Sequence, residues 1–294
     1  MGLPHVTSVV RPTSLEEAYD LLINADGAAR WLAGGIDIVR QSPSDDTTLI
    51  DISALPLHDI TPEQEGRVVS IGAAVTLTEL MESPLIAPLH HGELVSMFAG
   101  VASPLLRNLA TLGGSLGSCH PWSDIHTLLL ALGAHVEVYD GSYHTVDLAD
   151  VAPQRSVSRA LYTRILIPVP NGNQAASFEK FARTKFDVAL LNCACCISID
   201  AGRVESARVV AGGTPARAAR IQAAEARLLD TNLDDAAIRH AADAAADEPG
   251  LREDVRASAE YRRVLLKTGI RRCLLRVRSR TDLGSGSLTE RGVS

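Results

Sequence analysis

Residues 99–134 read AGVASPLLRNLATLGGSLGSCHPWSDIHTLLLALGA, and the interpretation of the whole chain starts from them. They contain a double glycine flanked by hydroxyl residues, from Thr111 to Ser115, followed by Asp124 and an apolar helical run. Because glycine has no Cβ, backbone N–H groups in such a loop can approach an oxyanion closely. Asp124 is predicted either to cap the helix or to accept a hydrogen bond from a ligand hydroxyl.

A second glycine pair lies far upstream, in the sequence Leu32-Ala-Gly-Gly-Ile-Asp37. A lone Gly-Gly pair is more typical of a turn, but two such loops can serve one elongated ligand that carries a pyrophosphate. Neither loop has the G-x-G-x-x-G pattern of a Rossmann site, and the P-loop pattern is absent from the sequence. The two loops together therefore predict a pyrophosphate site of another type.

The bulk composition narrows the class of protein. With 294 residues and 46% hydrophobic content, the chain is long enough for two domains. The net charge of −7, with no basic run interleaved with aromatic residues, argues against nucleic-acid binding. No apolar run has the length of a membrane span, and the N-terminal residues lack a signal-peptide core, so we expect a cytoplasmic protein.

Neither a metal site nor a catalytic residue is predicted. Cys193, Cys195 and Cys196 form C-x-C-C within an apolar run, a spacing that matches neither a zinc pair nor an iron–sulfur sequence. We expect these thiols to serve as small buried hydrophobic groups. The histidines are scattered, and His120 is only a weak candidate for a base. The sequence assigns no role to Trp122.

The order of predicted elements favours an α+β fold, because strands and helices do not alternate strictly. Capping boxes predict helices after Ser14 and Thr76, and a longer helix is expected over 85–98. Three antiparallel strands are predicted at 177–186, 188–200 and 203–212, followed by helices at 223–229, 234–247 and 254–275, the last capped by Asp254. We expect domains at 1–175 (subdomains about 1–55 and 56–175) and 176–278, with a disordered tail at 279–294.

Several motifs in series resemble the FAD-binding medium subunit of molybdenum hydroxylases, the family of the xanthine dehydrogenase and carbon monoxide dehydrogenase flavoprotein subunits. The resemblance covers about residues 5–278. The matching motifs are LAGGID (32–37), SPLLRN (103–108), TLGGSL (111–116), P-x-x-D (121–124), FAR (181–183), DVALL (187–191), AGGTPAR (211–217) and DVRASAEYR (254–262).

The resemblance implies which residues bind FAD. The first glycine loop would wrap the pyrophosphate through its backbone amides, the second would complete the diphosphate and ribityl site, and Asp124 would bind sugar or ribityl hydroxyls. Ile36 replaces the usual Thr or His of the family, and Ser115 replaces the common Asn. The implied cofactor-binding residues are Leu32, Ala33, Gly34, Gly35, Ile36, Asp37, Ala99, Gly100, Thr111, Gly113, Gly114, Ser115, Asp124, Leu166 and Lys180.

The resemblance also implies a fold and a role. The fold would be a two-subdomain FAD-binding domain (PCMH/VAO-like), followed by a three-stranded antiparallel sheet with a helical bundle. The chain would be the electron-transfer flavoprotein of an oxidoreductase complex, with [2Fe-2S] clusters on a small subunit and a molybdopterin cofactor on a large one. A doubled heterotrimer is the family expectation. Electrons would leave through FAD to NAD⁺, oxygen or another acceptor.

Two other functions fit parts of the sequence. A stand-alone flavin oxidoreductase would need a substrate pocket with a base near the flavin ring, for which only His120 is available. A non-catalytic assembly subunit that has lost FAD is suggested by Ile36 and Ser115, but the retained glycines and Asp124 argue against it. Neither the substrate nor the electron acceptor can be inferred from this chain.

Overall fold

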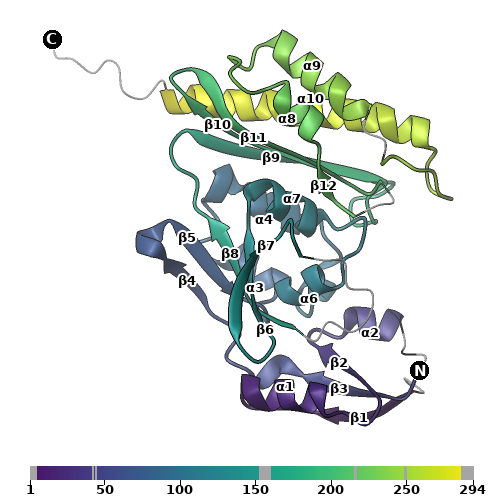
Figure 1. Cartoon of the computed structure of the whole chain (residues 1–294). Helices are drawn as coiled ribbons and strands as arrows, with labels where there is room; N and C mark the ends of the chain where they lie inside the picture. Colours follow the sequence, from purple (N-terminus) through teal and green to yellow (C-terminus); the bar gives the residue numbers. More distant parts are fainter. Residues whose placement is uncertain are drawn as a thin grey trace. The chain divides into compact units, whose positions relative to one another are not determined.

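The computed structural model describes residues 5–41, 43, 45–151, 160–214, 217–247 and 250–285. The chain divides into two compact units, each built from three separate segments. The first unit comprises residues 1–87, 98–120 and 133–168, and the second comprises 88–97, 121–132 and 169–294. Within the described ranges, no helix is both long enough and apolar enough to cross a membrane. The mixture of sheets and helices confirms the α+β class (Figure 1).

Two sheets form the first unit. The smaller is parallel, in the order β1-β3-β2, from β1 (Val6–Val10), β2 (Ala28–Leu32) and β3 (Thr47–Asp51). The larger is antiparallel, in the order β4-β5-β8-β6-β7. Its strands are β4 (Ile60–Glu63), β5 (Val68–Gly72), β6 (His135–Tyr139), β7 (Tyr143–Asp147) and β8 (Leu161–Pro168).

Short helices connect these strands, and the N-caps predicted at Ser14 and Thr76 are present, although at Ser14 the Glu17 carboxylate accepts from the Thr13 N–H. Helix α1 (Leu15–Ile23) is capped by Ser14, whose hydroxyl accepts from the Glu17 N–H. Helix α3 (Leu77–Glu82) has the complete capping box of Thr76 and Glu79. The apolar face of α1 joins residues of both sheets in one core. The remaining helices of this unit are α2 (Ile36–Arg40), α5 (Pro104–Arg107) and α6 (Leu112–Gly117), with the 3-10 turns η1 (Ile52–Ala54) and η2 (Gln64–Gly66).

The predicted helix over 85–98 is shorter than expected. The chain forms the 3-10 turn η3 (Leu89–Gly92) and then helix α4 (Glu93–Ala99), which spans the boundary between the units. His90 and His91 have left-handed φ angles of 48° and 59°, which a continuous α-helix does not accommodate. The helix therefore begins at Glu93.

The second unit is a sheet covered on both faces. Its order is β12-β11-β10-β9, from β9 (Gln174–Phe181), β10 (Leu191–Asp200), β11 (Arg203–Gly212) and the two-residue edge strand β12 (Ala219–Arg220). The three predicted strands are present, but the first lies at 174–181 instead of 177–186 and the second begins at Leu191 instead of residue 188, and a short fourth strand lies at the edge. Helix α7 (Asp124–Leu132) packs against β10 and β11, while α8 (Gln222–Ala226), α9 (Asp235–Ala246) and α10 (Ala259–Ser285) lie on the opposite side (Figure 1).

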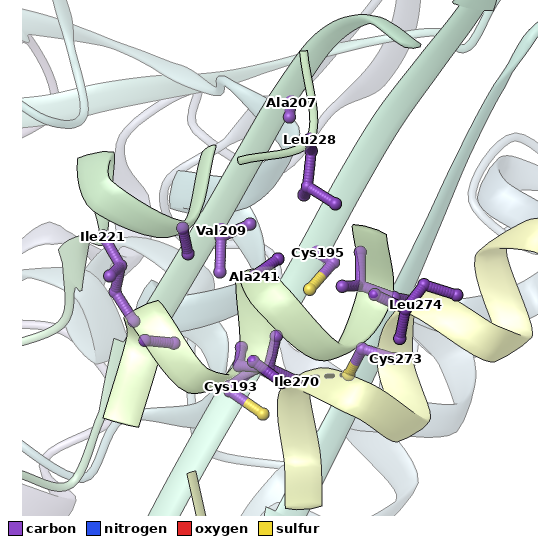
Figure 2. Packing of buried hydrophobic residues seen from close by; sticks show 14 of the residues in the cluster. Cys193, Cys195, Ala207, Val209, Ile221, Leu228, Ala241, Ile270, Cys273 and Leu274 are labelled. Atoms are coloured by element: carbon purple, nitrogen blue, oxygen red, sulfur yellow. Dashed lines mark hydrogen bonds between the residues drawn. The ribbon is translucent and has the colours of Figure 1, made fainter. Parts of the chain in front are cut away.

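The cysteines of β10 are buried within this unit, as predicted from composition. Cys193 and Cys195 belong to the apolar cluster under α9 and α10, where Cys273 also lies (Figure 2). All three are fully buried free thiols. Burial raises the pKa of Cys196 to about 12, which keeps that thiol protonated. These thiols therefore act as hydrophobic packing groups.

Both predicted ends of the last helix are wrong: helix α10 begins and ends later than the sequence predicts. Asp254 does not cap it: its carboxylate accepts from the N–H groups of Arg256 and Ala257 in a separate turn, and the helix begins at Ala259. The helix also continues to Ser285, so residues 279–285 are helical instead of disordered. Arg280 explains this extension, since it donates to Glu93 Oε2 (2.6 Å) and to the Ala176 carbonyl. Residues 286–294 of the predicted tail lie outside the described residues.

The start of α10 depends on Arg262, a fully buried arginine. Its guanidinium donates to Leu190 O (3.0 Å), Arg252 O (2.6 Å) and Asp254 Oδ1 (2.8 Å). Burial alone would raise the pKa of the Asp254 carboxyl, but hydrogen bonds from Arg256 and the charge of Arg262 lower it to about 2. We expect Arg262→Ala to reduce the free energy of unfolding by about 3–5 kcal/mol, because Asp254 and two carbonyls lose their partner.

This expectation is tested by urea unfolding of the Arg262→Ala, Asp254→Asn and Arg262→Ala/Asp254→Asn variants. The double variant should be less destabilised than the sum of the two single changes, since it removes the uncompensated carboxylate. Arg239→Ala, an exposed change on α9, serves as the matched control. Strict additivity of the two changes would contradict the assigned ion pair.

His90 gives the second unit a pH-dependent stability. Its ring is 2% exposed, and neither ring nitrogen has a hydrogen-bond partner among the residues that the structure describes. Burial lowers its pKa from 6.5 to about 4, with the charges of His91 and Arg280 adding to the effect. Between pH 6.5 and pH 4, His90 is therefore protonated in the unfolded chain but neutral in the folded chain.

We expect the free energy of unfolding to fall by about 1.4 kcal/mol per pH unit from this residue as the pH drops from 6.5 to 4. His90→Asn should remove this component, since asparagine does not titrate and tolerates left-handed φ. Urea unfolding at pH 7.5 and pH 5 measures the difference. The exposed His240→Asn variant should keep the wild-type slope; an equal slope in His90→Asn would refute the assignment.

Candidate functional site

The first glycine loop follows β2 and leads directly into α2. Gly34 has no room for a side chain, since a Cβ there would lie 1.7 Å from the Leu109 carbonyl oxygen. Gly35 has a left-handed φ of 74° and is the N-cap of α2, with no side-chain cap. The backbone amides at this turn are therefore not occupied by a capping side chain, as a loop that binds an oxyanion requires.

The second glycine loop is folded around Thr111. The Thr111 hydroxyl accepts from the Gly114 N–H (3.1 Å) and caps α6, while the Ser115 hydroxyl donates to the Thr111 carbonyl (2.8 Å). A Cβ on Gly113 would lie 2.6 Å from the Ala73 side chain. A Cβ on Gly114 would lie 2.8 Å from Thr111 Oγ1 and 3.5 Å from the Ala33 side chain of the first loop.

The structure thus brings the two predicted loops into contact, although 75 residues or more separate them along the chain. Gly34 packs against Leu109, and Gly114 packs against Ala33. Both contacts lie within the first unit. The turn of the first loop, which has no capping side chain, and the small residues of the second loop form a surface with little side-chain bulk, on which an extended diphosphate can lie.

His120 adds a third link between the loops, which sequence reasoning did not foresee. Its Nε2 atom lies 2.9 Å from Asp37 Oδ2 and 2.8 Å from Arg40 Nη2, both on α2. Arg40 also donates to Asp37 Oδ1 at 3.0 Å. The hydrogen bond from His120 lowers the pKa of Asp37 well below its usual range, with Ser118 and Arg40 adding to it and burial opposing it.

Asp124 and Lys180 form a buried ion pair in the second unit. Asp124 Oδ2 lies 2.8 Å from Lys180 Nζ, and its Oδ1 accepts from Asn192 Nδ2 at 2.7 Å. Burial raises the pKa of the Asp124 carboxyl, while the charge of Lys180 and the Asn192 amide oppose that rise. Ser123, not Asp124, caps α7, since its hydroxyl accepts from the His126 N–H. This leaves the Asp124 carboxylate for Lys180 and Asn192.

Asn192 is the site residue that sequence reasoning missed. It faces Lys180 across the β9–β10 pairing and is fully buried, and its Oδ1 accepts from the Thr127 hydroxyl at 2.9 Å. A Cβ on Gly212 would lie 2.4 Å from both Asn192 Oδ1 and Thr127 Oγ1. The signal in the sequence was a single amide side chain within an otherwise apolar strand.

The remaining predicted site residues lie on separate elements. Ala99 ends α4 and is followed by Gly100; the Ala99 carbonyl accepts from the Arg107 guanidinium at 3.3 Å. Leu166 is half-buried on β8, the strand against which α6 packs. Trp122, to which the sequence assigned no role, has the Arg256 guanidinium 5.1 Å from its ring centroid in the second unit. Trp122 therefore makes a cation–π packing contact.

Comparison with known proteins identifies both parts of the chain. Residues 5–170 match the family described as the FAD binding domain in molybdopterin dehydrogenase. Residues 176–277 match the CO dehydrogenase flavoprotein C-terminal domain. The first match alone covers more than half of the chain. These matches confirm the resemblance found in the sequence motifs.

Curated relatives and solved structures agree with these matches. The chain is 30% identical to the nicotine 6-hydroxylase medium subunit of Paenarthrobacter nicotinovorans, over 96% of this chain and 100% of that one. It is 28% identical to the carbon monoxide dehydrogenase medium chain of Hydrogenophaga pseudoflava, over 90% and 94%. The crystal structure of quinoline 2-oxidoreductase from Pseudomonas putida 86 matches with a TM-score of 0.85 and 26% identity, over 96% and 99% of the two chains.

The buried ion pair generates a prediction about stability. Asp124→Asn removes the carboxylate that pairs with the buried Lys180 ammonium, and Lys180→Met removes the ammonium that pairs with the buried Asp124 carboxylate. We expect each change to lower the free energy of unfolding by about 3 kcal/mol, and the double variant to lose less than the sum. Urea unfolding of the four proteins in the cycle measures the coupling. Lys185→Met, at an exposed lysine, should have little effect; additive losses would show that the pair is not coupled.

Proposed function

This chain belongs to the family of FAD-binding medium subunits of molybdenum hydroxylases, and we propose that it is the electron-transfer flavoprotein of such a complex. Its relatives are subunits of oxidoreductases, so the class of activity follows from family membership. The observation that carries the proposal is the contact between the two glycine loops, Gly34 against Leu109 and Gly114 against Ala33.

The loops have the features that an FAD diphosphate requires. Backbone amides from residues 33–37 would hold the diphosphate, because no side chain at Gly34 or Gly35 stands in front of them. The Gly114 and Ser115 N–H groups already donate to the Thr111 hydroxyl and carbonyl, so the second loop would line the site through its small residues. The carbonyl of Thr111 already engages the Ser115 hydroxyl, which orients that side chain within the loop. Ile36 has no hydroxyl or imidazole, so it would contribute through its backbone amide alone.

The remaining residues are proposed from the family resemblance. Asp124 would accept from sugar or ribityl hydroxyls, with its carboxylate held by Lys180 and Asn192. Lys180, Leu166 and the backbone at Ala99 and Gly100 are proposed to lie near the isoalloxazine ring. When bound, FAD supplies the exchange of one or two electrons, and the protein supplies binding, orientation and electrostatics.

The finer parts of the proposal concern partners and electron acceptor. A small subunit with [2Fe-2S] clusters and a large molybdopterin subunit would complete the complex, as a doubled heterotrimer in the cytoplasm. Substrate oxidation would then take place on the large subunit. The acceptor for the electrons would be NAD⁺, oxygen or another oxidant.

The visible spectrum of the full chain, purified with its partner subunits, tests the proposal. We expect a flavin spectrum and the release of near-stoichiometric FAD on denaturation. Gly114→Val should reduce the FAD content at least tenfold, because the added side chain would occupy the space between Thr111 Oγ1 and Ala33. Circular dichroism of each preparation checks that the chain remains folded.

Gly172→Val provides the matched control, since a Cβ at Gly172 meets no atom within 4 Å. This variant should retain wild-type FAD content. A folded complex without flavin, which takes up no added FAD, would contradict the proposal and favour an assembly subunit. Full FAD retention by Gly114→Val would show that the second loop does not face the cofactor.

A further inference from the structure

Arg107 holds the backbone segment that precedes helix α5. Its Nη1 atom donates to three carbonyl oxygens, those of Ala99 (3.3 Å), Val101 (3.0 Å) and Ala102 (2.9 Å). The residue is buried, and a terminal guanidinium nitrogen carries only two hydrogens, so the three acceptors share them. One side chain therefore fixes the orientation of three peptide groups within residues 99–102.

The backbone of residues 99–102 has a conformation that needs such support. The Val101 N–H donates to the Phe98 carbonyl at 3.0 Å, which closes a turn at the end of α4. Ala102 then has a left-handed φ of 51°, which an alanine adopts only at a cost in energy. Residues in such backbone regions persist where the surrounding contacts over-determine them, and they are frequent at ligand-binding sites. At Ala102, the Arg107 guanidinium supplies one of these contacts.

Helix α5 connects this segment to the first glycine loop. The Ser103 hydroxyl caps the helix, and the Arg107 N–H donates to the Ser103 carbonyl at 3.0 Å. Shortly after Arg107, the Leu109 carbonyl is the group against which Gly34 packs. All of these residues belong to the first unit. Arg107 therefore lies between the segment 99–102 and the backbone that contacts the first glycine loop.

We propose that Arg107 is a positioning residue for FAD, which fixes the backbone of residues 99–102 relative to the glycine loops. This inference rests on the proposed function, in which Ala99 and Gly100 lie near the isoalloxazine ring and the first glycine loop holds the diphosphate. A site that is already ordered at both places loses less entropy when an extended ligand binds. In this role Arg107 acts through the three carbonyls and needs no contact of its own with FAD.

The test compares FAD with ADP, which carries the diphosphate but has no flavin ring. The full chain is purified with its partner subunits and stripped of flavin; flavin fluorescence then gives the dissociation constant of FAD, and competition against FAD gives that of ADP. For Arg107→Met we expect the FAD constant to rise about tenfold and the ADP constant to change less than about twofold, because methionine donates to none of the three carbonyls. The ratio of the two constants does not depend on enzymatic activity.

Two further variants separate positioning from folding. Arg107→Lys keeps a cation but lacks the planar fork of the guanidinium, so it should weaken FAD about threefold and leave ADP unchanged. Arg67→Met, at an arginine of the same unit whose side chain is 75% exposed, should bind both ligands as the wild type does. Urea unfolding measures the stability of each protein separately, and if Arg107→Met does not fold, Arg107→Lys carries the test.

The outcomes distinguish the inference from the function on which it rests. Selective loss of FAD affinity supports the positioning role. Equal weakening of FAD and ADP would make Arg107 a structural residue only, and unchanged FAD affinity would leave it no role at the site; both results overturn the inference while FAD binding by the wild type stands. Absence of FAD binding by the wild type, or of competition by ADP, would contradict the proposed function, and this inference with it.

Discussion

The site in the first unit depends on the close approach of two backbone segments that leaves no space for a Cβ. A Cβ on Gly34 would lie 1.7 Å from the Leu109 carbonyl oxygen, so the contact with that backbone requires a glycine, while a Cβ on Gly114 would lie 2.8 Å from Thr111 Oγ1 and 3.5 Å from Ala33. Any larger residue at Gly34 would force the Leu109 backbone to move. In the first loop the same absence of side chains leaves the turn without a capping side chain, so that packing and the proposed anion binding depend on one feature.

Charge is arranged differently in the two units. In the first, Asp37, Arg40 and His120 form a partly exposed cluster in which His120 Nε2 contacts both other side chains. In the second, the Asp124–Lys180 pair is buried and supported by Asn192. In a buried pair, the change of either partner leaves the other charge without compensation.

In the second unit, helices pack on both faces of one buried strand, and this packing stabilises the unit. Strand β10 is buried along Leu191–Ser198, between α7 on one face and α10 on the other. Three arginines along α10 form ion pairs with other segments of the second unit. Arg262, near the start of the helix, pairs with Asp254, Arg276 with Glu179 (2.6 Å) and Arg280 with Glu93. These contacts order a segment whose composition alone is polar and rich in glycine and serine.

The sequence alone determined the fold class, the capped helices at Ser14 and Thr76, the buried role of the cysteines and the family, because these depend on local pattern and on motifs in series. It also pointed to both glycine loops and to Asp124. Only the tertiary structure revealed that the loops touch, that Asn192 completes the Asp124 network, that His120 reaches Asp37, and that α10 extends to Ser285. Each of these rests on side chains far apart in the chain, and their pairing is set by long-range packing, which local sequence patterns do not encode.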